Sequence, residues 1–293
     1  MKPAPFEYVA AESLAHALEI KAKHGDEARF LAGGQSLIPA MNFRLARPSC
    51  IVDINPLVEL DYVRKQGNGA LQIGALTRHR TVERHALIVA HQPLLHEAAP
   101  NVAHPQIRNR GTLCGNLANA DPASEFPAVI VALGARLRAQ SSRGERWIEA
   151  RDFFMGLFTT AMRTDEMLVE VEIPKQSLRT GTCFIEVARR RGDYAMMGVA
   201  CVVTLREDGV CSHAQLVYCN AGESPVGAME AAGGLIGRRI SEKSMDEAAA
   251  LVPQEIRPSG NVHASAAFKR HLAGVLTRRA LGKALARAQS QCT

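Results

Sequence analysis

The pattern of apolar and polar positions in the N-terminal part of the chain predicts a small β-α-β unit. Within residues 12–24 the apolar side chains are spaced for one face of a helix. Short apolar strands are expected at residues 29–32 and 50–54, with a helix over residues 37–45 between them. This first lobe would carry a glycine turn, Gly33-Gly34, at its centre.

In the middle of the chain, apolar and polar positions alternate in shorter runs than in the N-terminal part. A helix is expected at residues 93–102, where apolar residues follow a proline. Strands are expected at residues 60–63, 70–73, 75–76 and 166–173, and a hairpin from residues 135–139 and 147–148. The alternation therefore predicts a second lobe built mainly on antiparallel strands.

The last third of the chain predicts a separate unit. Three strands of an antiparallel sheet are expected at residues 184–187, 197–205 and 214–218, followed by helices at residues 245–252 and 264–288. Strands and helices do not alternate regularly, so the fold class is α+β rather than a doubly wound sheet. We expect an N-terminal lobe at 1–55, a second lobe at 56–176 and a C-terminal domain at 177–288.

Charge and composition narrow the possible ligands. The 293 residues carry a net charge of +6, with 47% hydrophobic and 5% aromatic residues. The basic residues are scattered and few aromatics could stack on bases, which argues against nucleic-acid binding. A diphosphate ligand or an acidic partner subunit explains the same charge.

Neither the cysteines nor the histidines form a recognisable ligand pattern. The seven cysteines include no C-x-x-C pair, and histidines such as His24 and His79 are isolated in the sequence. We therefore expect no metal site and no catalytic residue in this chain. No apolar stretch reaches membrane-spanning length and the first residues lack a signal core, which predicts a cytoplasmic protein.

Two glycine segments carry the candidate chemistry. They are Ala32-Gly33-Gly34-Gln35-Ser36-Leu37 and Thr112-Leu113-Cys114-Gly115-Asn116-Leu117-Ala118-Asn119. Glycine permits positive φ and close approach of a ligand, and successive N–H groups then form an anion-binding concavity. Either segment alone could be an ordinary turn. Neither matches the Rossmann or P-loop spacing, so the pair favours a diphosphate site of another kind.

These segments resemble the two flavin motifs of the medium subunits of molybdenum hydroxylases, a family that includes aerobic carbon monoxide dehydrogenase and xanthine dehydrogenase. The resemblance extends over nearly the whole chain. It also includes Asp53-Ile54-Asn55, Ile73-Gly74-Ala75-Leu76-Thr77, Asp121-Pro122-Ala123-Ser124-Glu125, Ile173-Pro174 and Arg189-Arg190-Arg191-Gly192-Asp193-Tyr194-Ala195.

The resemblance implies a bilobal FAD-binding fold of the vanillyl-alcohol-oxidase type plus a C-terminal domain. The FAD diphosphate would lie between the two segments, with contacts from Ala32, Gly33, Gly34, Gln35, Ser36, Thr112, Leu113, Cys114, Gly115 and Asn116. Glu125 would accept the ribityl hydroxyl groups, Leu168 would border the adenine, and Asp193 and Tyr194 would lie near the isoalloxazine ring. For three of these residues a structural role is the alternative: a solvated helix charge for Glu125, core packing for Leu168 and a surface ring for Tyr194.

Three positions depart from the family pattern. Gln35 stands where relatives often carry His or Asn, and Cys114 where glycine is commoner. Some relatives have a lysine shortly before the arginine run, where this chain has Glu186, so that contact is not carried over. These departures leave the FAD prediction standing.

The resemblance implies an electron relay. A large partner subunit would hold a molybdopterin-type cofactor and hydroxylate the substrate, and a small subunit would hold two [2Fe–2S] clusters. FAD in this chain would receive the electrons and pass them to an external acceptor, in a dimer of heterotrimers. Two alternatives remain open: a stand-alone FAD-dependent oxidase or reductase, and a non-catalytic module whose glycine turns are only structural.

Overall fold

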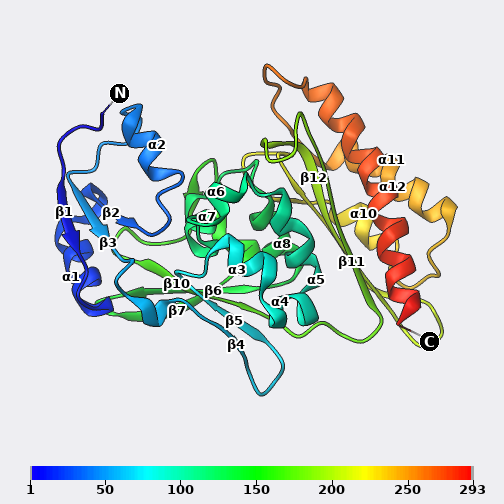
Figure 1. Ribbon diagram of the computed structural model, residues 1–293. Coiled ribbons are helices and arrows are strands. Elements are labelled where there is room, and N and C mark those ends of the chain that lie inside the picture. Colours follow the sequence, from blue (N-terminus) through cyan, green and yellow to red (C-terminus); the bar gives the residue numbers. More distant parts are fainter. Residues whose placement is uncertain (1, 292–293) are drawn as a thin grey trace.

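The computed structural model describes residues 2–291 and places three units side by side. The middle lobe lies between the N-terminal lobe and the C-terminal domain (Figure 1). Among the described residues, no helix is both long and apolar enough to cross a membrane.

The N-terminal lobe is a three-stranded parallel sheet of order β1-β3-β2, with β1 at Glu7–Ala10, β2 at Ala28–Leu31 and β3 at Cys50–Asp53. Helix α1 spans Leu14–His24 and leads through a 3-10 turn, Gly25–Glu27, into β2. Strand β1 was missed because its residues are mostly exposed and leave no apolar pattern.

Helix α2 occupies Leu37–Asn42, shorter than the predicted residues 37–45. Arg44 has a φ of 59°, a left-handed conformation that cannot continue a helix. The apolar residues that suggested a longer helix, Phe43 and Leu45, are 68% and 84% exposed.

The middle lobe contains a five-stranded antiparallel sheet of order β4-β5-β10-β6-β7. Its strands are β4 (Val63–Lys65), β5 (Leu71–Gly74), β6 (Arg136–Ser141), β7 (Gly144–Glu149) and β10 (Met167–Ile173). The predicted hairpin is the β6–β7 pair. The strand expected at residues 60–63 is wrong, because a 3-10 helix at Val58–Leu60 precedes β4.

Short helices cover this sheet, and most of them lie above it in Figure 1. They are α3 (His79–Arg84), α4 (Ala86–His91), α5 (Pro93–Ala98), α6 (Pro105–Arg108), α7 (Leu113–Asn119), α8 (Glu125–Ala132) and α9 (Ala150–Phe153). The helix expected at residues 93–102 is α5 continued by a 3-10 turn, Ala99–Asn101. A two-stranded ribbon, β8 (Phe154–Gly156) with β9 (Thr159–Thr160), follows α9.

The C-terminal domain is built on a sheet of four strands rather than the predicted three. The strands are β11 (Thr180–Ala188), β12 (Ala195–Leu205), β13 (Cys211–Cys219) and β14 (Val226–Gly227). Strand β14 has two residues, too few to produce a periodic pattern. Helices α10 (Met229–Gly233), α11 (Glu242–Glu255) and α12 (Ala266–Ser290) complete the domain.

Both faces of this sheet are buried, and alternate residues of β12 show how. Ala200 and Val202 pack into the core of the middle lobe, whereas Val199 and Cys201 pack into a second core with α11 and α12. The side chain of Arg287 on α12 also bonds both carboxylate oxygens of Glu97 on α5, at 2.8 and 3.0 Å. The domain is therefore attached to the middle lobe by apolar packing and by an ion pair.

Candidate functional site

The first glycine segment forms the turn between β2 and α2. Gly34 has a φ of 70°, a conformation that favours glycine. The side-chain amide of Gln35 donates a hydrogen bond to the Gly33 carbonyl at 3.0 Å, which holds the turn together. Residues 31–35 line a cleft of about 380 Å³, within the range of about 300–1,000 Å³ that is usual for ligand sites. Ser36 is exposed at the start of α2 and makes no capping hydrogen bond.

The second glycine segment turns into α7. The Thr112 hydroxyl accepts a hydrogen bond from the Gly115 N–H at 3.1 Å, so this side chain caps the helix. Leu113 and Cys114 are buried in the core, which leaves only their backbone for a ligand. Asn116 is half-buried and accepts a hydrogen bond from Ser124 at 2.9 Å. With six and seven residues, α2 and α7 are short, so the N–H groups of the turns are the donors available to an anion.

The structure brings Gly33 of the first segment against Arg110 and Gly111, which directly precede the second segment. A Cβ added to Gly33 would lie 2.5 Å from the Arg110 carbonyl oxygen and 2.6 Å from the Gly111 Cα. Only glycine permits this approach, because a methyl group would overlap the opposite backbone. The two predicted anion-binding turns are therefore neighbours, although about eighty residues separate them in the sequence.

A polar bridge also joins the two turns. The Asn55 amide donates to the Ala32 carbonyl at 2.9 Å, and its oxygen accepts from the Arg78 guanidinium at 2.6 Å. Arg78 also donates to the Arg110 carbonyl, just before the second turn. Arg110 itself lines the cleft. These two cations give the contact region the positive charge that a diphosphate requires.

His79 supports the second turn from behind. Its ring stacks on Phe126 at 5.2 Å between centroids, and it packs tightly against Gly111. Burial, helped by the charges of Arg108 and Arg78, lowers the pKa of His79 to about 3, so the ring is neutral. This histidine is therefore a packing residue.

Glu125 begins α8 and is buried, with 4% of its surface exposed. Burial, with the charge of Asp121, raises its pKa to about 7. The alternative role given for Glu125, a solvated helix charge, is therefore wrong. Glu186 on β11 faces the same space, where burial and the charge of Glu125 raise its pKa to about 8. Within residues 2–291, the Oε2 atom of Glu186 is buried without a hydrogen-bond partner, so a ligand that donates a hydrogen bond would fit here.

The remaining predicted contacts lie in different environments. Leu168 is buried in the core on β10, which is the role given as its alternative. Asp193 forms an ion pair with Arg189 at 3.0 Å. Tyr194 is 69% exposed, while partial burial of its hydroxyl group and the carboxylates of Asp121 and Glu125 raise its pKa. Tyr194 and Glu125 thus belong to one neighbourhood, and Leu168 contributes packing.

Two cations of the site, Arg78 and Arg110, were not singled out from the sequence. Their roles depend on contacts across the fold, and no local motif marks them. Glu186 was set aside because it departs from the family pattern, yet it lies close enough to Glu125 for their charges to interact, and its Oε2 atom is buried. The bridge, the neighbouring turns and the carboxylates of Glu125 and Glu186 together fit a nucleotide that carries both phosphates and hydroxyl groups.

Comparison with known proteins identifies the family. A model of the FAD-binding domain in molybdopterin dehydrogenases matches residues 4–176. A model of the C-terminal domain of the carbon monoxide dehydrogenase flavoprotein matches residues 182–284. Subunit alpha of the 6-hydroxypseudooxynicotine dehydrogenase complex of Paenarthrobacter nicotinovorans is 43% identical and covers 99% of this chain and 97% of its own length.

Solved structures agree over the whole length. Carbon monoxide dehydrogenase of Hydrogenophaga pseudoflava superposes with a TM-score of 0.95 at 33% identity, over 98% of this chain and 99% of that chain. Quinoline 2-oxidoreductase of Pseudomonas putida 86 gives 0.92 at 35% identity, over 100% of both chains. The resemblance predicted from the sequence is thus confirmed, and the chain belongs to the family of FAD-binding medium subunits of molybdenum hydroxylases.

Proposed function

We propose that this chain is the FAD-binding component of a heterotrimeric molybdenum hydroxylase. It would accept electrons from [2Fe–2S] clusters of a small partner subunit and pass them to an external acceptor. A large partner subunit would hold the molybdopterin-type cofactor and hydroxylate the substrate. The observation that carries this proposal is the contact of Gly33 with residues 110–111, which supports one shared site for the two turns.

Within this chain, residues 32–36 and 112–116 would present backbone N–H groups to the FAD diphosphate. Arg78 and Asn55 would fix the distance between the turns, and Arg110 would add positive charge. When bound, FAD supplies a carrier that takes up single electrons and releases a pair. No residue of this chain is required as a general acid or base for substrate hydroxylation.

The carboxylates at the other end of the site suit hydroxyl groups. Glu125 and Glu186 lie together in a buried space, and an ionised carboxylate there would accept hydrogen bonds from the ribityl chain. The exposed ring of Tyr194 lies beside this pair and would cover one face of the isoalloxazine ring. Asp193 would hold this segment in place through its ion pair with Arg189.

The substrate would be chosen in the large subunit. Similar proteins include subunits of caffeine dehydrogenase (45% identical), glyceraldehyde dehydrogenase (38%) and carbon monoxide dehydrogenase (35%). Their names cover a purine, an aldehyde and a gas, while the chains remain similar to this one. This supports substrate selection outside the medium subunit.

We further propose a dimer of heterotrimers in the cytoplasm. The boundaries between the lobes of this chain would lie near residues 55 and 176.

The tip of the β8–β9 ribbon exposes three apolar side chains: Met155 is 66% exposed, Leu157 57% and Phe158 59%. An apolar tip of this kind suits contact with another subunit better than contact with water.

Purification of the complex from its native source tests the proposal. We expect one complex that contains this chain together with flavin, iron and molybdenum, measured by visible spectroscopy and metal analysis. Turnover of a small substrate by the isolated chain would instead support a stand-alone oxidase or reductase. A chain that remains colourless after addition of FAD would show that the turns are only structural.

A further inference from the structure

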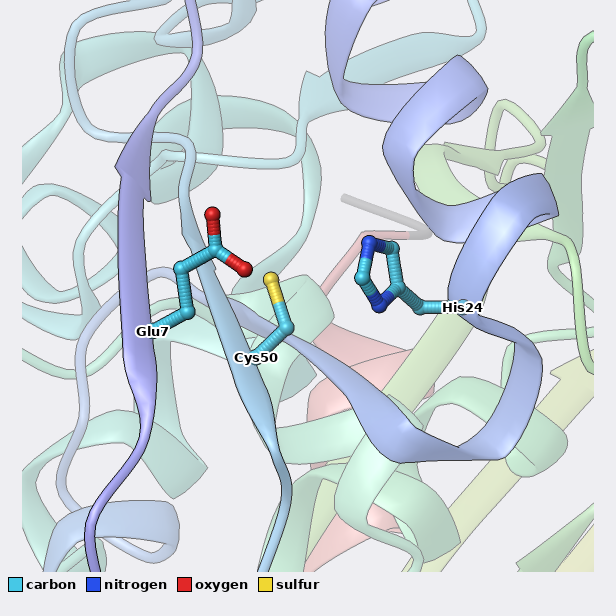
Figure 2. Close-up of side chains that lie close together, drawn as sticks. All are labelled: Glu7, His24 and Cys50. Atoms are coloured by element: carbon cyan, nitrogen blue, oxygen red, sulfur yellow. The ribbon is translucent and has the colours of Figure 1, made fainter.

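Three side chains with metal-binding chemistry meet in the N-terminal lobe, away from the nucleotide site. Glu7 lies on β1, Cys50 on β3 and His24 at the end of α1 (Figure 2). One ligand atom from each residue lies within 4.8 Å of the other two. In Figure 2 the Glu7 carboxylate and the His24 ring lie on either side of the Cys50 thiol.

The backbone fixes this arrangement. Glu7 and Cys50 are direct partners in the parallel β1–β3 pairing, and Ala28 of β2 pairs with Cys50 from the other side. Helix α1 ends at His24, where Gly25 has a φ of 55° and turns the chain back toward β2. Lys21 holds this turn by donating hydrogen bonds to the Gly25 and Ala28 carbonyls at 2.7 and 2.8 Å. The three ligands therefore project from fixed elements, as a metal site needs.

The donor set is one that zinc uses. Thiolate, imidazole and carboxylate bind zinc at about 2.3, 2.0–2.1 and 2.0–2.2 Å, and three protein ligands leave a fourth position for water. Ligand atoms on one zinc ion are then about 3.3–3.6 Å apart, so the side chains must close by about 1 Å. Glu7 is exposed and His24 is half-buried, so rotation of these two side chains allows that movement.

The charges also favour a divalent ion. A Cys50 thiolate and a Glu7 carboxylate would together balance the two positive charges of the metal. The thiol must lose its proton to bind the ion, and that proton is released to solvent. The charge of nearby Lys23 opposes a cation, but this side chain is exposed and free to turn toward solvent.

We propose that Glu7, His24 and Cys50 bind one zinc-like divalent ion that ties β1, α1 and β3 together. Strand β3 begins at Cys50 and ends at Asp53, which lines the nucleotide cleft about 10 Å along the strand. The ion would therefore stabilise the lobe that carries the first turn, and it would take no part in electron transfer. This inference does not depend on the proposed function.

Cobalt(II) added to the purified metal-free chain provides the direct test. We expect one cobalt ion per chain with a thiolate-to-cobalt absorption band, which only a cysteine ligand produces. Cys50→Ser should abolish the band, and Cys183→Ser, at another buried thiol, should leave it unchanged. Absence of the band in the wild-type chain, or its persistence in Cys50→Ser, would overturn the proposal.

Two further ligand variants and one control variant guard against loss of binding by misfolding. Glu7 is exposed, so Glu7→Gln should fold normally. Its zinc affinity should nevertheless fall at least about tenfold, because even residues that only support metal ligands contribute 10- to 100-fold to affinity. His24→Asn should behave alike, whereas His16→Asn on the same helix should match wild type. At one fixed zinc concentration, the melting temperature should rise more for wild type and His16→Asn than for Glu7→Gln and His24→Asn. Equal affinities and equal shifts in all four proteins would contradict the site.

Discussion

Replacement of Gly33 by alanine separates the two turns with a change of one methyl group. The new Cβ would lie 2.5 Å from the Arg110 carbonyl oxygen, whereas ordinary contact begins near 3.4 Å, so the turns must part by about 1 Å. Overpacking of this size costs about 1–3 kcal/mol of stability. A hydrogen bond from a turn N–H to the diphosphate, normally 2.7–3.2 Å long, is broken when the distance grows by about 1 Å. Each hydrogen bond to a charged group contributes about 1.5–3 kcal/mol.

Loss of one such bond predicts a weaker complex with FAD. The Kd should rise on the order of 10- to 100-fold, measured by titration of FAD fluorescence. The control is Gly67→Ala in the β4–β5 turn, where an added Cβ meets nothing within 4 Å, and it should bind as wild type. If Gly33→Ala unfolds more easily yet keeps the wild-type Kd, the two turns do not hold the same diphosphate. If neither property changes, the close contact itself is wrong.

Other changes test the rest of the site. Arg78→Gln removes the charged link between the turns and should raise the Kd for FAD about tenfold or more, measured by the same titration. Burial raises the pKa of Glu186 from 4.5 to about 8, so the folded chain keeps a proton that the unfolded chain releases, and stability falls as pH rises through that interval. Glu186→Gln should reduce the fall in the free energy of unfolding between about pH 5 and pH 8, measured by urea unfolding of the FAD-free chain. If the pH dependence is unchanged, the fall belongs to Glu125 instead. Glu97→Gln should cost about 1 kcal/mol at this partly exposed pair, and a double-mutant cycle with Arg287→Gln should show non-additivity.

The variants Gly34→Val and Gly115→Val, which the glycine motifs suggest first, are less informative. Gly34 has a φ of 70° and its added Cβ would meet Leu31 at 3.1 Å, so any side chain strains the turn without a ligand. At Gly115 the Cβ would lie 2.6 Å from the Thr112 hydroxyl and disturb the helix cap. Loss of FAD binding in these variants could therefore result either from distortion of the turn itself or from loss of contacts with FAD.

The sequence predicts the features that local patterns encode. Both turns were found because glycines and polar donors stand together, and the sheet of the C-terminal domain because its strands are long and apolar. Strand β1 was not predicted because its side chains are mostly exposed. Strand β14 was not predicted because it has only two residues. Local sequence patterns do not reveal strands that form only by pairing with distant segments of the chain.

The site shows the same limit. Arg78 reaches Asn55 and Arg110 only after three separate segments have folded together. Glu7, His24 and Cys50 look unrelated in the sequence, and parallel pairing of β1 with β3 brings two of them face to face. Glu125 was singled out from the sequence, but its burial near Glu186 depends on contact between the middle lobe and the C-terminal sheet.

A crystal structure of this chain with FAD tests the central claim most directly. We expect the two phosphates between the Gly34 and Gly115 turns, within hydrogen-bonding distance of backbone N–H groups from both. Phosphates bound to one turn alone, or outside the cleft that residues 31–35 and Arg110 line, would contradict the account.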